Sequence, residues 1–243
     1  MKIGIVIVTY NIDTRIFILQ VESIKRFCKD KDYTIQIIDN SSDEAKAESI
    51  RYYSNVHNVY HRRTNSGNAD ASRSHAFAAN LSYQILKEQY NGFFYLDHDC
   101  IPVKDFSVEE ILGDKIIAGV RSGTVINYFW PGCLMWNDTQ IEAGLINFSP
   151  INELRADTGG GTYKIIEKYG MEKCIFFDEV GCENPHFANT PLYYFYMMIY
   201  RNTFIHFINA SNWNPTENNE SRLNSLIDIT NNKIQENNER NSL

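Results

Sequence analysis

Two carboxylates stand one residue apart at the end of an apolar run, Phe93 to Leu96, and they are the residues best placed for chemistry. On an extended backbone, side chains two positions apart point to the same face, so we expect Asp97 and Asp99 to project together, with His98 turned away. A divalent ion held by one or two carboxylates and by phosphate oxygens is typical of Mg²⁺ and Mn²⁺ sites. The pair indicates a metal-assisted site for a phosphorylated ligand. Two solvated aspartates that cap a strand are the simpler alternative.

The first hundred residues alternate between patterns typical of strands and of helices. Runs rich in β-branched and aromatic residues predict strands at 2–9, 34–39, 56–61 and 93–96. Apolar residues at helical spacing predict helices through Phe17, Val21, Ile24 and Cys28 and through Ala78, Leu81 and Ile85. This alternation predicts an α/β fold with a mostly parallel central sheet flanked by helices, and ligands bind such sheets at the carboxyl ends of strands. The two carboxylates fall at such an end.

The second part of the chain has a different character, with shorter strand patterns, Gly-rich turns and aromatic clusters. We expect one domain over residues 1–213, with a nucleotide-binding half at 1–102 and a mixed, loop-rich half at 103–213. Residues 214–243 are a polar, Asn-rich C-terminal tail with a sparse apolar stripe. This composition fits either a docked amphipathic helix or a disordered segment.

Composition argues against several classes of protein. A formal net charge of −7 without a visible basic stripe argues against a nucleic-acid partner. No apolar stretch approaches the length of a transmembrane segment, and the apolar start reads as a first strand rather than a signal peptide. The five cysteines are scattered, which argues against a disulfide framework and a structural zinc site. A cytoplasmic location fits best.

Glycine motifs that bind phosphate are missing from the expected places. The first predicted turn, residues 9–14, has no glycine, so it lacks the dinucleotide-binding fingerprint, and no Gly-x-x-x-x-Gly-Lys-Ser/Thr loop appears elsewhere. A bound metal is therefore the leading candidate for holding a phosphate.

Five short segments occur in a set order over roughly the first 100 residues: IVIVTYN (5–11), IIDNSSD (37–43), NSGN (65–68), SHAFAAN (74–80) and DHD (97–99). Together they resemble the family 2 glycosyltransferases, which have the glycosyltransferase A fold of nucleotide-diphospho-sugar transferases. The resemblance implies that the first half binds a nucleotide-sugar donor and that residues 103–213 form the acceptor half. Read singly, the segments around 39 and 65 are also ordinary turns.

The resemblance implies roles for individual donor-site residues. The base and ribose pocket would be lined by Thr9, Tyr10 and Asn11, with Asn65 and Gly67 beside the nucleotide and Arg73 contacting the diphosphate. Asp39 would accept a hydrogen bond from the base, and because a carboxylate suits the ring N–H of uracil, a UDP-sugar is the favoured donor. Asp97 would reach the ribose or the metal, and Asp99 would bind Mn²⁺ or Mg²⁺ directly.

The acceptor half offers fewer signals. By resemblance, an acidic residue near a helix start acts as general base, and Asp157 is the best positional match; a simple N-cap is the alternative. Trp130, in an aromatic run that ends in Pro-Gly, is expected at the sugar or acceptor, although core packing is commoner for Trp. His206 lies in an apolar strand and would complete the metal shell, or is a core histidine.

The predicted function is the metal-dependent transfer of a sugar, with inversion at the anomeric carbon, from a nucleoside-diphosphate sugar to a hydroxyl of a glycan, protein or lipid-linked acceptor. A homo-oligomer is compatible with the aromatic run at 193–200. Two alternatives stay open: a non-catalytic nucleotide-sugar or glycan-binding module, and a sugar nucleotidyltransferase, which generally needs a Gly-rich, basic first turn.

Overall fold

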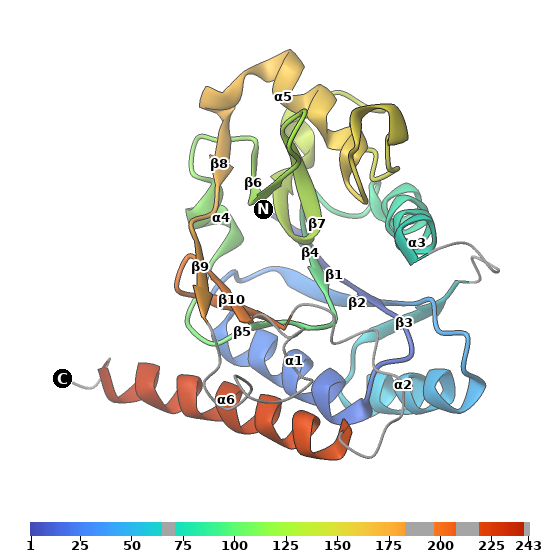
Figure 1. Cartoon of the computed structure of the whole chain (residues 1–243), viewed down its shortest axis with the longest axis vertical. Helices are drawn as coiled ribbons and strands as arrows, with labels where there is room; N and C mark the ends of the chain where they lie inside the picture. Colours follow the sequence, from blue (N-terminus) through green and yellow to red (C-terminus); the bar gives the residue numbers. More distant parts are fainter. Residues whose placement is uncertain (65–70, 183–196, 208–218, 241–243) are drawn as a thin grey trace.

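The central sheet of this protein is mixed but mostly parallel. In the computed structural model, which describes residues 1–64, 71–182, 197–207 and 219–240, this sheet has seven strands in the order β3-β2-β1-β4-β7-β6-β8 (Figure 1). The strands are β1 (Ile3–Thr9), β2 (Tyr33–Asp39), β3 (Tyr60–Arg63), β4 (Gly92–Asp97), β6 (Ile117–Ser122), β7 (Tyr128–Asn137) and β8 (Cys174–Phe176). Of these seven, β7 runs antiparallel to its neighbours β4 and β6. The predicted α/β class is confirmed.

Three of the four predicted strands agree with the structure to within about one residue at each end. The strand predicted at 56–61 is wrong over its first part, because Val56 is the last residue of a helix and β3 begins at Tyr60. β3 is an edge strand with mostly exposed, polar side chains, so hydrophobic patterning carries little signal there.

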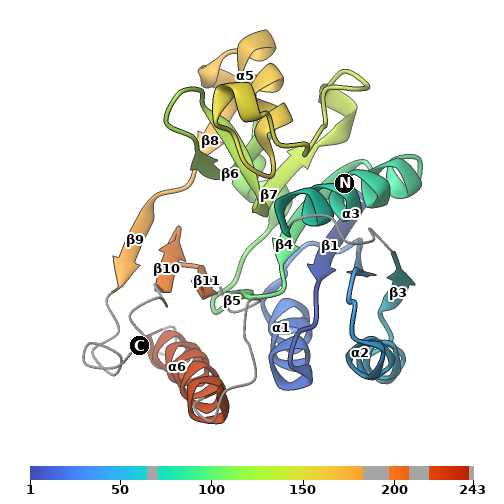
Figure 2. The ribbon, with the colours of Figure 1, turned by 45° about the vertical axis from the view of Figure 1, so that its right-hand side comes forward.

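Helices cover both faces of this sheet. They are α1 (Thr14–Phe27), α2 (Glu44–Val56), α3 (Ala71–Leu86), α4 (Val108–Leu112), α5 (Tyr163–Tyr169) and α6 (Asn219–Arg240). Side chains alternate along β1, so Ile5 and Ile7 pack in a core with Phe17 of α1, whereas Val6 and Val8 pack in a second core with Ala78 of α3. In Figure 2, α1 and α2 lie on one side of the sheet, with α3 and α5 on the other.

A second, smaller sheet follows directly from the carboxyl end of β4. Within the described residues its antiparallel strands run in the order β5-β11-β10-β9, with β5 at Cys100–Pro102, β9 at Glu179–Cys182, β10 at Met197–Tyr200 and β11 at Phe204–Phe207. Short 3₁₀ turns at Asp138–Gln140, Asn152–Leu154, Gly160–Thr162 and Met171–Lys173 link other parts of the second half. Because only residues 98 and 99 separate β4 from β5, the predicted carboxylates lie between the two sheets.

The C-terminal segment forms a docked helix over the part that is described. Leu223, Leu226 and Ile234 of α6 are buried in the α1-side core. Glu220 pairs with Arg15 of α1, and the amide of Asn237 donates to the backbone oxygen of Val103 at 2.9 Å. Figure 1 shows α6 running alongside α1. The proposed boundary between the 1–213 domain and the tail stays a prediction.

The expectations about membrane-spanning segments and about disulfides can be compared with the described residues. Among the described helices, none is long and apolar enough to cross a membrane. The four cysteines whose side chains are described, Cys28, Cys100, Cys133 and Cys174, are buried and form no disulfide with one another.

Candidate functional site

The turn between β4 and β5 gives its two carboxylates different partners. Asp97 ends β4 and its Oδ1 lies 2.9 Å from Nε2 of His75, whereas Asp99 Oδ1 lies 3.4 Å from Nε2 of His206. The expectation that both project from one face of an extended strand is wrong, because the strand ends at residue 97 and the next two residues turn. The Gln20 amide of α1 fixes this turn by donating to the backbone oxygens of residues 97 and 100, at 2.7 Å each.

His75 couples α3 to the carboxylates. Burial alone would lower the pKa of His75, but the charge and hydrogen bond of Asp97, with smaller contributions from Asp99 and Asp157, raise it overall. Conversely, burial would raise the pKa of Asp97, and His75 lowers it below the ordinary value. The charge of Asp157 therefore acts in the same neighbourhood as the β4 carboxylates.

His206 is held by aromatic neighbours from two sheets. Its Nδ1 lies 2.9 Å from the hydroxyl of Tyr200, and its ring centroid lies 4.6 Å from that of Trp130 on β7 at 33° between planes. A Cβ at Gly132 would lie 2.0 Å from the Trp130 indole, so glycine is needed for the indole to occupy this position. Trp130 thus lies in the candidate site, packed on His206.

The predicted metal ligands are only partly assembled. Within the part of the chain that the structure describes, no group of three His, Cys, Asp or Glu side chains is placed to hold a metal ion. Asp99 and His206 do face each other. The hydroxyl of Tyr200 lies against Nδ1 of His206, so Nε2 is directed toward the carboxylate of Asp99. Metal-ligating histidines are commonly oriented in this way by a hydrogen bond to their other ring nitrogen. Asp97 is instead engaged by His75. The residues present fit a divalent ion with two protein ligands and phosphate or water oxygens in its other positions.

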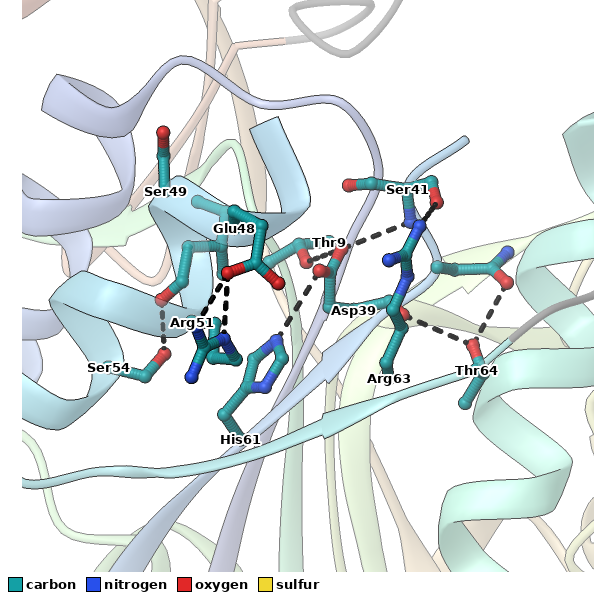
Figure 3. Close-up of polar contacts among 12 residues, drawn as sticks. Thr9, Asp39, Ser41, Glu48, Ser49, Arg51, Ser54, His61, Arg63 and Thr64 are labelled. Carbon is teal, nitrogen blue, oxygen red and sulfur yellow. Dashed lines mark hydrogen bonds and ion pairs between the residues drawn. The ribbon is translucent and has the colours of Figure 1, made fainter. Parts of the chain in front are cut away.

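The side chain of Asp39 is completely surrounded by neighbouring residues (Figure 3). Its side chain has no exposed surface; Oδ1 accepts from the backbone N–H of Ser41 at 3.0 Å and from the hydroxyl of Thr9 at 3.2 Å, and Oδ2 lies 3.4 Å from Nε2 of His61. Burial alone would raise the pKa of Asp39, but hydrogen bonds from His61 and Ser41 outweigh this effect and hold the pKa below the ordinary value. The prediction that Asp39 accepts a hydrogen bond from the base needs an accessible carboxylate, whereas the carboxylate of Asp39 is buried at the end of β2 between Thr9 of β1 and His61 of β3.

Of the three predicted base-pocket residues at the end of β1 and just after it, Tyr10 has the accessible side chain. Thr9 is fully buried, whereas Tyr10 is 41% exposed and its hydroxyl lies 3.1 Å from that of Ser42. Asn11 has a left-handed backbone, with φ of 47°, and its side-chain oxygen accepts from the backbone N–H groups of Ser42 and Asp43. Asn11 therefore ties the loops after β1 and β2 together, and Tyr10 lies beside them.

Asp157 lies on a loop that contacts the start of α3. The loop is closed by a bridge between Ile151 and Ala156, and the hydroxyl of Thr158 donates to the backbone oxygen of Ser72 at 3.0 Å. Asp157 is exposed, and its Oδ1 accepts from the N–H of the next residue at 2.7 Å. The N-cap alternative is wrong, because α5 has Thr162 at its N-cap position.

The remaining predicted contacts fall elsewhere. Arg73 is exposed on α3, at a helical position turned away from His75. Asn65 and Gly67 lie outside the described residues, so their predicted places beside the nucleotide stay predictions. The site also contains contributors that the sequence analysis did not select, among them Gln20, Tyr200 and His61. Tyr200 could have been found as a polar tip in an apolar strand, whereas His61 lies in a polar edge strand that gives no such signal.

No protein-family model matches the sequence, and no curated protein matches it significantly. Solved structures with a similar course of the chain include a mannosyltransferase, PcManGT from Pyrobaculum calidifontis, in complex with GDP-Man and Mn²⁺, at 12% identity and a TM-score of 0.48, covering 72% of this chain and 54% of that one. The apo structure of the bifunctional glycosyltransferase WbbM has 17% identity and a TM-score of 0.47, with coverages of 72% and 38%. An active-site mutant of LgtC has 15% identity and a TM-score of 0.38, with coverages of 56% and 58%. This chain thus spans between two fifths and three fifths of the length of these structures, and membership of family 2 stays a prediction.

Proposed function

We propose that this protein transfers a sugar from a nucleoside-diphosphate sugar to an acceptor hydroxyl, with a divalent metal ion at the end of β4. The observation that carries the proposal is the pairing of Asp99 with His206 between the two sheets, 3.4 Å apart and both more than nine-tenths buried. A carboxylate and an imidazole are suitable Mn²⁺ ligands, and the carboxyl edge of an α/β sheet is where such folds bind nucleotides.

The neighbouring loops supply a place for the nucleotide. Tyr10 has an exposed ring next to the loop after β2, which suits stacking on a base. The preference for uracil depended on Asp39, whose carboxylate is closed off by Thr9, Ser41 and His61. We therefore propose a nucleoside diphosphate and leave the base to experiment, with UDP as the first compound to test.

Asp157 is proposed as the general base of a single, inverting displacement. The acceptor oxygen forms its bond to the anomeric carbon as the bond from that carbon to the diphosphate oxygen breaks, the acceptor proton passes to the carboxylate of Asp157, and the nucleoside diphosphate leaves. When bound, a metal ion supplies positive charge that stabilises the departing diphosphate. His75 holds the carboxylate of Asp97 in place at the end of β4, and the ring of Trp130 packs against His206.

A thermal-shift panel tests the proposal. UDP, GDP, dTDP and CMP are each added with and without Mn²⁺ to the wild type, to Asp99→Ala and to Asp105→Ala, an exposed carboxylate outside the site. A ligand present at 100 times its dissociation constant stabilises the native state by about 2.7 kcal/mol. We expect one diphosphate to raise the melting temperature of the wild type and of Asp105→Ala in the presence of Mn²⁺, and Asp99→Ala to lose this shift. If no nucleotide shifts the wild type, the proposal is wrong.

A further inference from the structure

A cavity of about 580 Å³ lies between α3 and the loop that carries Asp157, and its lining includes Phe77, Gln84, Ser149 and Glu153. We propose that this groove, called here the α3 groove, binds the oligosaccharide chain of the acceptor, away from the sugar unit that reacts. The inference deepens the proposed transferase function and rests on it. The volume is within the usual range for small-molecule sites, roughly 300–1,000 Å³.

The α3 groove is separate from the candidate donor site. Residues of an α-helix are rotated by about 100° each, so Arg73, Phe77 and Gln84 share one side of α3, and His75 points to nearly the opposite side. His75 faces Asp97 at 2.9 Å. The groove therefore lies behind α3 as seen from the β4 carboxylates.

The walls of the groove are fixed by hydrogen bonds between its two sides. Asn80 of α3 accepts from the backbone N–H of Phe148 at 2.9 Å, and its amide donates to the hydroxyl of Ser149 at 3.3 Å. At the other end, the Thr158 hydroxyl donates to Ser72. Figures 1 and 2 both show α3 beside the segment that follows β7. A preformed groove of this kind loses little conformational entropy when a ligand binds.

The lining has the chemistry of a carbohydrate site. Phe77 is 45% exposed, and an accessible aromatic ring offers a flat apolar surface to the C–H face of a sugar. Gln84, Asn152 and Glu153 on the rim supply amide and carboxylate groups, which can donate to and accept from sugar hydroxyls. Ala76, Leu81 and Pro150 extend the apolar surface beside Phe77, so the groove pairs an apolar patch with polar groups, as the C–H faces and hydroxyls of a sugar require.

The loop connects the groove to the proposed base. Glu153 lines the groove, and Asp157 follows four residues later, beyond the bridge between Ile151 and Ala156. An acceptor whose terminal hydroxyl reaches Asp157 can thus extend past the start of α3 and place its further sugar units against Phe77. The groove is expected to discriminate oligosaccharides from monosaccharides.

The test uses the whole 243-residue chain with Mn²⁺ and UDP or GDP on an array of defined oligosaccharides of two to six units, with monosaccharides and short peptides as comparisons. Affinity for the strongest oligosaccharide is then measured for the wild type, for Phe77→Ala, for Asn152→Trp, which fills the groove from its exposed rim, and for Tyr52→Ala, an exposed aromatic residue on α2. Melting temperatures establish that each variant is folded.

We expect the wild type to bind oligosaccharides, and Phe77→Ala and Asn152→Trp each to weaken that binding by about tenfold or more, as removal of an aromatic anchor usually does. Tyr52→Ala should bind as the wild type does. The inference is overturned if no oligosaccharide binds, if peptides bind instead, or if the folded groove variants bind as tightly as Tyr52→Ala. If the protein binds a nucleotide but no oligosaccharide on the array, this inference is wrong and the transferase proposal is unaffected. If it binds an oligosaccharide but no nucleotide, the transferase proposal is wrong and the groove is a glycan-binding site without that activity.

Discussion

Replacement of Asp39 by asparagine tests whether this carboxylate is structural, as its enclosure indicates. The wild-type side chain is completely buried and accepts hydrogen bonds from Ser41 and Thr9 through one oxygen, while the other faces His61. Asparagine keeps the shape of the side chain but carries no charge, and its amide group donates where the carboxylate accepted. The change therefore removes the charge and one acceptor oxygen while the size of the side chain is kept.

The expected loss of stability follows from these contacts. A hydrogen bond to a charged group contributes about 1.5–3 kcal/mol and a neutral one about 0.5–1.5 kcal/mol, so each of the two bonds at 3.0 and 3.2 Å loses about 1 kcal/mol. The contact with His61, at 3.4 Å, adds little. We expect Asp39→Asn to destabilise the fold by about 2 kcal/mol at neutral pH.

The pH dependence gives a second, independent check. Because the pKa of Asp39 is lowered in the folded protein, its stabilisation is complete above the unfolded value of about 3.9 and is lost as the pH falls through the folded pKa. The difference between the wild type and Asp39→Asn should therefore be full at pH 7 and shrink below about pH 4.

Urea unfolding at pH 7 and at pH 3.5, with the midpoint and slope determined separately, measures both effects. Glu48→Gln is the matched control in the same region, because Glu48 is exposed and pairs with Arg51 on the surface; its midpoint should not change measurably. A loss below about 0.5 kcal/mol for Asp39→Asn would refute the structural role, because the hydrogen bonds from Ser41 and Thr9 would then gain nothing from the charge.

Three further changes test other parts of the account. Asp157→Asn should retain nucleotide binding while turnover falls by a factor on the order of 10² to 10⁴, measured as release of nucleoside diphosphate; near-normal turnover would exclude it as the base. Gly132→Ala should displace the indole of Trp130, because the added Cβ would lie 2.0 Å from it, and near-UV circular dichroism should change; an unaltered spectrum would contradict the described packing. Leu226→Ala should destabilise the protein by about 2–5 kcal/mol because α6 is docked, whereas Asn224→Ala on its exposed side should not; equal urea midpoints for the two variants would show that the helix is not part of the fold.

The parts of the fold that the sequence predicted are those with local signals. β1 and β4 are continuous apolar runs because both of their faces are buried, and the stripe of Phe17, Val21 and Ile24 marks the buried side of α1. The start of β3 could not be predicted from apolar patterns because β3 is an exposed edge strand. The contact between His61 of β3 and Asp39 of β2 depends on the pairing of these two strands, and no local pattern in the sequence indicates it.

The partners of the two carboxylates could not be predicted from local patterns. The turn at residues 98 and 99 breaks the alternation of an extended strand, and Asp99 meets a histidine more than a hundred residues further along the chain through the pairing of β5 with β11. His206 was selected from its apolar strand, but Tyr200 and the ring contact with Trp130 depend on how the small sheet lies against β7. Such contacts between distant segments are set by tertiary packing.

Anomalous scattering from crystals grown with Mn²⁺ and a nucleoside diphosphate is the most direct test of the proposed site. The account predicts a manganese peak in contact with both Asp99 and His206, with diphosphate oxygens completing the coordination, and no peak in crystals of Asp99→Ala. A fully occupied nucleotide whose diphosphate lies away from these two side chains, or a manganese ion bound at a different place, would contradict it.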